Sequence, residues 1–122
     1  MTKILLVEDE QTLQKTLGDI FTKEGYKVIN ALDGEVGLKL AKKEKPDLIL
    51  LDVILPKMTG FEVLKELKND SDTRFIKVVI LTNLENVEDV EKALSLGATT
   101  YLVKTDYSLS GILEKVKKII EK

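Results

Sequence analysis

Residues 48–52 read Leu48-Ile49-Leu50-Leu51-Asp52, four apolar side chains followed by an acid. An unbroken apolar run of this kind is typical of a strand that is buried on both faces of a parallel sheet. A carboxylate at the end of such a strand is costly to bury unless a cation or hydrogen-bond donors compensate its charge. Asp52 is therefore the first candidate for a functional residue.

Three further apolar segments also lead into polar side chains. They are Ile4–Val7 before Glu8-Asp9-Glu10, Val78–Leu81 before Thr82, and Tyr101–Val103 before Lys104. In an open parallel sheet, the carboxyl ends of the strands form the edge at which ligands bind. The sequence thus predicts acids, a hydroxyl group and an amine at one edge of a sheet.

Apolar residues at helical spacing lie between these segments. Helices are predicted around Leu13–Phe21, over Gly34–Lys43, around Phe61–Leu67, from Val87 to Gly97, and from the N-cap candidate Ser108 onward. A more exposed strand is predicted over Lys27–Ala31, and the last strand over Thr99–Val103. Gly25 suits a helix C-cap, and Pro46 ends the second helix.

The alternation of strands and helices predicts an α/β fold of the (βα)5 type. Strands joined through single helices are parallel, with right-handed crossovers. Lys27–Ala31 is the least hydrophobic strand and belongs at an edge, which gives a doubly wound sheet in the flavodoxin-like order 2-1-3-4-5. Strands 1 and 3 are then neighbours at the topological switch point, so Glu8, Asp9 and Asp52 share one crevice.

Composition indicates one soluble domain over residues 1–122, with 43% apolar residues, 33% charged residues and a formal net charge of −2. The lysines are interleaved with acids, so no nucleic-acid surface is predicted. No segment approaches the roughly 20 apolar residues of a membrane span. Met1-Thr2-Lys3 leads directly into a strand, so we expect no signal peptide, no membrane binding and a cytoplasmic location.

The chain contains neither cysteine nor histidine, which excludes disulfides, thiol nucleophiles and histidine acid–base catalysis. Any metal must be held by oxygen atoms, which favours Mg²⁺, Ca²⁺ or Mn²⁺. A divalent cation would relieve the repulsion between three clustered carboxylates. Together with Lys104 and Thr82, such a site suits phosphoryl transfer to Asp52, which would attack in line while the cations neutralise the equatorial oxygens.

Five segments, in this order and at this spacing, resemble the receiver domain of bacterial two-component response regulators over the whole chain. They are Ile4–Glu10, Leu50–Gly60, Val78–Thr82, Leu96–Ala98 and Tyr101–Lys104. The resemblance implies that Asp52 is the phosphoacceptor and that Mg²⁺ is the cofactor. It also implies that Glu8, Asp9, Asp52 and the backbone carbonyl of Ile54 are the metal ligands.

The resemblance implies further roles outside the metal site. Thr82 corresponds to the switch hydroxyl that moves toward the phosphoryl group. Tyr101 corresponds to the aromatic residue whose rotamer changes together with Thr82, and Lys104 corresponds to the ion-pair partner of the phosphoryl group. A sensor histidine kinase or a histidine phosphotransfer protein would be the donor. The surface of this chain on which the donor is expected to dock includes Thr12, Leu13 and Thr16.

Three positions depart from the usual receiver pattern. Thr105 replaces the proline that normally follows the lysine, and a non-proline cis bond costs about 3–4 kcal/mol, so we expect a trans peptide and a different loop. Thr59 stands where an aspartate is usual, and Asn83 is larger than the usual small residue. Ile54 and Leu84 offer nothing that could orient a water, so we expect slow loss of the phosphoryl group.

Two classes of function remain. The first is a phosphorylation-controlled switch that catalyses only its own aspartyl phosphorylation and dephosphorylation. It would act as a monomer, or as a weak dimer on phosphorylation, and would contact a downstream protein through the fourth helix, the fifth strand and the last helix. The second is a pseudo-receiver, a phosphorylation-independent interaction module, which Asn83 and Thr105 keep open. A phosphatase of the haloacid-dehalogenase type is set aside because Ile54 stands where that class needs a second acid.

Overall fold

The computed structural model describes residues 1–121 and contains one parallel five-stranded sheet. The strands are β1 (Lys3–Val7), β2 (Lys27–Ala31), β3 (Leu48–Leu51), β4 (Lys77–Thr82) and β5 (Thr100–Val103). Their order is β2-β1-β3-β4-β5, with every neighbouring pair parallel. The predicted doubly wound (βα)5 fold and its strand order are therefore confirmed.

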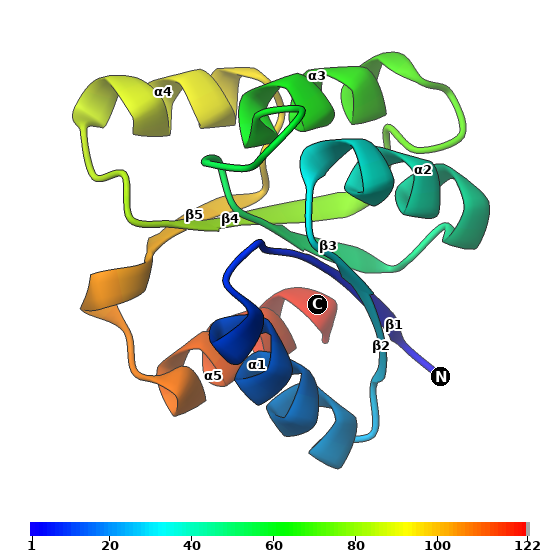
Figure 1. The fold of residues 1–122 in the computed structure, drawn as a ribbon, viewed down its shortest axis with the longest axis vertical. Helices are drawn as coiled ribbons and strands as arrows, with labels where there is room; N and C mark the ends of the chain where they lie inside the picture. The colour runs from blue at the N-terminus through cyan, green and yellow to red at the C-terminus, as the bar shows by residue number, and fades with distance from the viewer. Residues whose placement is uncertain (122) are drawn as a thin grey trace.

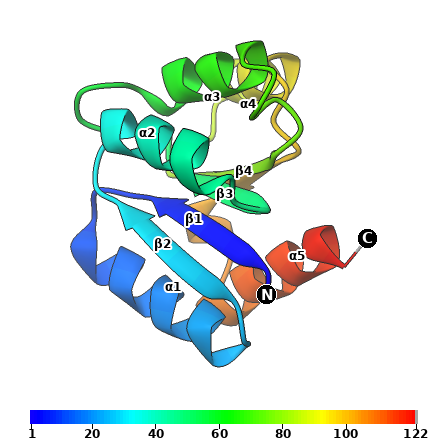
Figure 2. The same ribbon diagram turned by 90° about the vertical axis from the view of Figure 1, so that its right-hand side faces the viewer.

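Helices cover both faces of this sheet (Figures 1 and 2). They are α1 (Gln11–Lys23), α2 (Gly34–Glu44), α3 (Gly60–Asn69), α4 (Val87–Ser95) and α5 (Leu109–Ile120), with a short 3-10 helix, η1, over Lys104–Asp106. Helices α1 and α5 lie on one face, and α2, α3 and α4 lie on the other. None of the helices within residues 1–121 has the length and apolar character needed to span a bilayer.

The central strands are buried on both faces because successive side chains of a strand point to opposite sides. In β1, Leu5 packs in the core beneath α2, α3 and α4, whereas Leu6 packs in the core beneath α1 and α5. In β3, Ile49 and Leu50 divide in the same way. This two-sided burial explains why β1 and β3 read as continuous apolar runs.

Most predicted element ends agree with the structure. Strand β4 ends at Thr82, and Asp52 follows the last residue of β3 directly. Gly25 has the positive φ of +94° that suits the chain after α1. The Ser108 side chain caps α5 by accepting a hydrogen bond from the backbone N–H of Gly111. The Lys104–Thr105 peptide is trans, as expected, and leads into η1.

The loop between β3 and α3 is fixed by close backbone contacts. The Gly34 N–H, at the start of α2, donates to the Pro56 carbonyl at 3.2 Å. A Cβ atom at Gly34 would overlap the Met58 carbonyl oxygen, and one at Gly60 would overlap the carbonyl oxygen of Asp52. Thr59 closes the loop as the N-cap of α3 in a capping box with Glu62.

We predict that Gly34→Ala destabilises the protein, because an added methyl group must displace the backbone of the β3–α3 loop. The expected loss is about 1–3 kcal/mol of unfolding free energy, as for other overpacked sites. Urea denaturation followed by circular dichroism measures it.

Gly18→Ala is the matched control. A Cβ at Gly18, within α1, meets only a Val28 methyl group at 3.8 Å, an ordinary contact. Removing a mid-helix glycine should therefore stabilise by about 0.5–1 kcal/mol. Equal stability of Gly34→Ala and the wild type would contradict the close contact described above.

Candidate functional site

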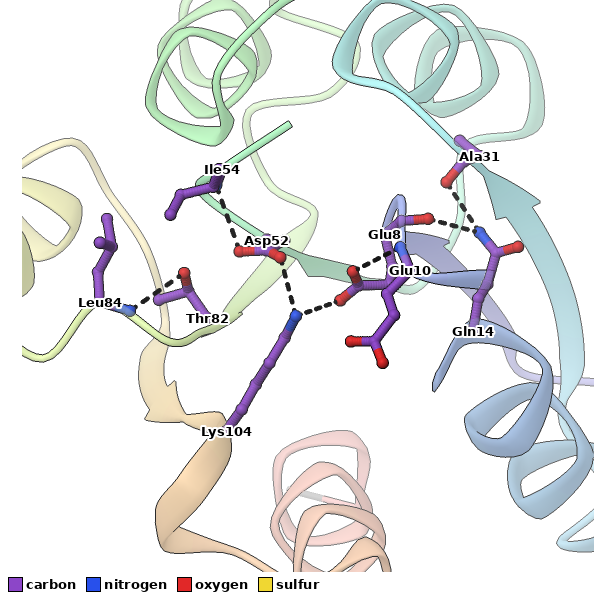
Figure 3. A network of polar contacts seen from close by, with 9 residues as sticks. All are labelled: Glu8, Glu10, Gln14, Ala31, Asp52, Ile54, Thr82, Leu84 and Lys104. Atoms are coloured by element: carbon purple, nitrogen blue, oxygen red, sulfur yellow. Dashed lines mark hydrogen bonds and ion pairs between the residues drawn. The ribbon is translucent and has the colours of Figure 1, made fainter. Parts of the chain in front are cut away.

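The predicted site residues lie at the carboxyl edge of the sheet, where strand register sets their spacing. Val7 is aligned with Leu51 across β1 and β3, so Glu8 and Asp52 emerge side by side. Thr82 is aligned with Val103 across β4 and β5, so Lys104 emerges beside the end of β4. Figure 3 shows Lys104 reaching across this edge toward both acids.

Lys104 forms an ion pair with two buried carboxylates at once. Its Nζ lies 2.7 Å from Glu8 Oε1 and 2.9 Å from Asp52 Oδ2 (Figure 3). Both acids are buried, each with a relative exposure of 6%. The ammonium group thus supplies the positive charge that Asp52, at the end of an apolar strand, requires.

The second oxygen of each carboxylate accepts a backbone hydrogen bond. Asp52 Oδ1 accepts from the N–H of Ile54 at 3.3 Å, and Glu8 Oε2 accepts from the N–H of Glu10 at 3.0 Å. Asp9 is exposed beside them. One oxygen from each of Glu8, Asp9 and Asp52 lies within 4.8 Å of the others, so this all-oxygen cluster could hold a metal ion.

For Glu8 and for Lys104, burial and the oppositely charged neighbours shift the pKa in opposite directions. Burial raises the pKa of Glu8, and the hydrogen bond from Lys104 only partly offsets that rise. For Lys104, burial acts to lower the pKa, but hydrogen bonds to Glu8 and Asp52 outweigh it and leave the pKa above the ordinary lysine value. Lys104 is therefore firmly cationic, while Glu8 gains a proton more readily than an exposed glutamate.

Thr82 and Tyr101 are both hydrogen-bonded to the backbone of one residue, Leu84, in the β4–α4 loop. Thr82 is fully buried, and its hydroxyl accepts a hydrogen bond from the N–H of Leu84 at 3.5 Å. The Tyr101 hydroxyl donates to the carbonyl of Leu84 at 2.8 Å. A displacement of Leu84 would therefore change the surroundings of both side chains.

The remaining predicted residues lie at the rim of the site or outside it. The side chains of Ile54, 58% exposed, and Asn83 help to line a solvent-open hollow that also contains the acids and Lys104. Thr12, Leu13 and Thr16 lie in the first turns of α1, and the Thr16 hydroxyl donates to the carbonyl of Thr12. They do not contribute to the ion-pair cluster.

Sequence reasoning missed Gln14. Its buried side-chain amide donates to the carbonyls of Glu8 and Ala31, at 3.2 and 2.8 Å. A signal was present, because Gln14 lies three residues before Leu17 and seven before Phe21, on the apolar stripe of α1. Glu10 occupies the N-cap position of this helix without a side-chain capping bond.

Comparison with known proteins identifies the family. The family model for the response regulator receiver domain matches residues 4–117, so the chain belongs to the response regulator receiver domain family. Receivers of this family act in two-component, phosphorelay signalling. The predicted resemblance is thus confirmed.

Curated relatives include short and long proteins. Sporulation initiation phosphotransferase F of Bacillus subtilis is 36% identical over 118 residues, covering 97% of this chain and 93% of that protein. The probable transcriptional regulator ycf27 of Porphyridium aerugineum is 40% identical over 102 residues, covering 84% of this chain. The chain spans only 41% of the length of that regulator.

Solved structures share the whole fold. The chemotaxis protein CheY4 of Vibrio cholerae superposes with a TM-score of 0.89 at 31% identity, over 97% of this chain and 98% of that one. A CheY-like receiver domain protein from Methanospirillum hungatei JF-1 gives a TM-score of 0.92 at 28% identity, over 99% and 94%.

We predict that Lys104→Met raises the pKa of Glu8 further, because it removes the hydrogen bond and positive charge that now lower it. A group whose folded pKa exceeds its unfolded value of about 4.5 contributes stability below that value and loses it as pH rises through the folded pKa. As the pH increases from about 4.5 through the folded pKa of Glu8, the unfolding free energy of the variant should therefore fall by more than that of the wild type.

Carboxyl-detected NMR titration of Glu8, together with urea denaturation at several pH values, tests both parts. Lys117→Met is the control, since Lys117 pairs with Glu24 on the α1–α5 side and not with the site acids. An unchanged Glu8 titration in Lys104→Met would show that the 2.7 Å ion pair has no influence on this carboxyl group.

Proposed function

We propose that the chain is a phosphorylation-controlled switch that accepts a phosphoryl group on Asp52 with the help of Mg²⁺. The observation that carries the proposal is the buried Asp52 carboxylate, 2.9 Å from Lys104 Nζ and next to an acid pair. The fold and family membership supply the two-component context. The donor would be a sensor histidine kinase or a histidine phosphotransfer protein in the cytoplasm.

In the proposed reaction, a carboxylate oxygen of Asp52 attacks the phosphorus of a phosphohistidine. The new P–O bond forms as the P–N bond breaks, and the electron pair of that bond leaves with the donor's imidazole. Lys104 transfers its contact from Asp52 to an oxygen of the incoming phosphoryl group. Its firmly cationic state suits this role.

The acid cluster fits the metal that this reaction uses. Glu8, Asp9 and Asp52 would hold Mg²⁺ together with the carbonyl of Ile54, an all-oxygen donor set of the kind that this ion prefers. When bound, Mg²⁺ supplies positive charge for the phosphoryl oxygens. Glu8 and Asp52 also balance the Lys104 charge, so a divalent ion and the lysine would share the same two acids.

The switching step would run through Leu84. A Thr82 hydroxyl that turns toward the phosphoryl group gives up the Leu84 N–H, and Tyr101 is bonded to the carbonyl of the same residue. The β4–α4 loop and Tyr101 would then shift together. The proposed output is a changed α4-β5-α5 face, where Val87 and Leu94 already expose apolar side chains to a protein partner.

Donor docking would use the start of α1. Thr12 is exposed, and Leu13 and Thr16 are half-buried, directly after the acid-bearing β1–α1 loop. This location is next to the hollow over Asp52, which suits a donor that must deliver phosphorus to that residue. In this proposal the protein works as a monomer or a weak dimer and turns over no separate substrate.

Phosphorylation should depend on both Asp52 and the metal. Incubation with acetyl phosphate and Mg²⁺ should add one phosphoryl group to the wild type, detected by intact mass, and none to Asp52→Asn. Chelation of Mg²⁺ should abolish the adduct, because the charge on the phosphoryl oxygens is then not neutralised. A wild type that gains no mass and binds no Mg²⁺ would instead support the pseudo-receiver, a constitutive interaction module.

We expect slow loss of the phosphoryl group, because neither Ile54, which lines the hollow over Asp52, nor Leu84, two residues after Thr82, has a polar side chain that could orient a water. We predict that Leu84→Gln shortens the lifetime of the phosphorylated form by about tenfold, less than the roughly 100-fold or more of a general base, because glutamine can orient a water but cannot take its proton. Leu94→Gln, an equivalent change on exposed α4, should leave the lifetime unchanged. Equal lifetimes in all three proteins would contradict a role for Leu84.

A further inference from the structure

Gln14 joins three elements behind the acid-bearing loop. Its Nε2 group donates to the carbonyl of Glu8, just after β1, and to the carbonyl of Ala31, at the end of β2 (Figure 3). The Ala31 carbonyl also accepts the N–H of Glu8 at 3.0 Å. The backbone of Glu8 is therefore held on both sides, by Ala31 at its N–H and by Gln14 at its carbonyl.

Net stability does not explain this arrangement well. A neutral hydrogen bond contributes only about 0.5–1.5 kcal/mol net, because folding exchanges hydrogen bonds to water for hydrogen bonds within the protein. An apolar side chain would fit the stripe that Leu17 and Phe21 continue. The amide does provide two directional contacts to fixed carbonyl groups, and so defines a geometry.

Apart from the Ala31 hydrogen bond and the Lys104 ion pair, the β1–α1 loop has few supports. Helix α1 has no side-chain N-cap, since Glu10 occupies that position without capping. The N–H of Glu10 is held by the Glu8 carboxylate, which is the same group that would bind a cation. A small cavity of about 10 Å³ lies beneath the loop, lined by Gln14, Glu8, Asp52 and surrounding leucines, so apolar packing is incomplete there.

We propose that Gln14 is a positioning residue for the divalent-cation site: by fixing the Glu8 backbone, it sets the direction in which Glu8 and Asp9 present their carboxylates. The inference rests on the proposed function and assigns part of its metal affinity to a residue that contacts no ligand. Mg²⁺ demands near-ideal octahedral geometry, whereas Ca²⁺ tolerates irregular sites. Loosening the loop should therefore affect Mg²⁺ more than Ca²⁺.

The test compares Gln14→Met with the wild type and with Gln11→Met, the same change at an exposed position of α1. Methionine preserves the length and volume of the side chain but removes both donors. Isothermal titration calorimetry should show Mg²⁺ affinity weakened about tenfold in Gln14→Met, the scale on which partners outside the ligand set affect metal affinity. The affinity for Ca²⁺ should fall less, and Gln11→Met should match the wild type.

Two results would overturn the inference while leaving the proposed function intact. One is a Gln14→Met variant whose affinity for Mg²⁺ equals that of the wild type. The other is an equal loss for both cations, which indicates general loosening. A wild type that binds no Mg²⁺ would overturn the proposed function and this inference with it. If Gln14→Met does not fold, Gln14→Asn, which retains the amide but withdraws it by one methylene, should show the same selective loss.

Discussion

The buried charge at the end of β3 is the constraint on which the rest of the site depends. Asp52 leaves an apolar strand with almost no access to water, and Lys104 and the Ile54 N–H compensate its charge. Since Lys104 also pairs with Glu8, one cation serves two carboxylates from different strands. The pair is costly to bury, so it is weak evidence for a stabilising role in the fold.

The parallel sheet makes this arrangement possible. The register between β1 and β3, and between β4 and β5, brings residues that are far apart in sequence to one edge of the sheet. Each of these residues lies at or directly after the end of its strand. Hydrogen bonds then fix the connecting loops: the Gly34 N–H and the Thr59 side-chain cap hold the loop after Asp52, and the Gln14 side chain holds the backbone of Glu8. The rigid strands determine where the chemical groups lie, and these contacts determine where they point.

Much of this could be predicted from the sequence, because buried parallel strands carry an unambiguous apolar signal and the motif spacing identifies the family. The two-sided pairing of Lys104 could not be predicted, since strand order places its Cα but not its flexible side chain. Gln14 was missed because its place on the apolar stripe of α1 indicates burial but does not show which carbonyl groups its amide contacts. The strand predicted over Thr99–Val103 begins one residue later, at Thr100, although the Thr99 N–H already donates to the carbonyl of Val78 in β4.

The close approach of Gly34 to the β3–α3 loop bears on how the site can be moved between proteins. Helix α2 contributes no charged group to the cluster, yet its first residue lies against the carbonyl groups that shape the loop after Asp52. A graft that transferred only the acids, the threonine and the lysine to another parallel sheet would therefore omit the backbone contact that shapes the loop after Asp52. The smallest transplantable unit includes the start of α2.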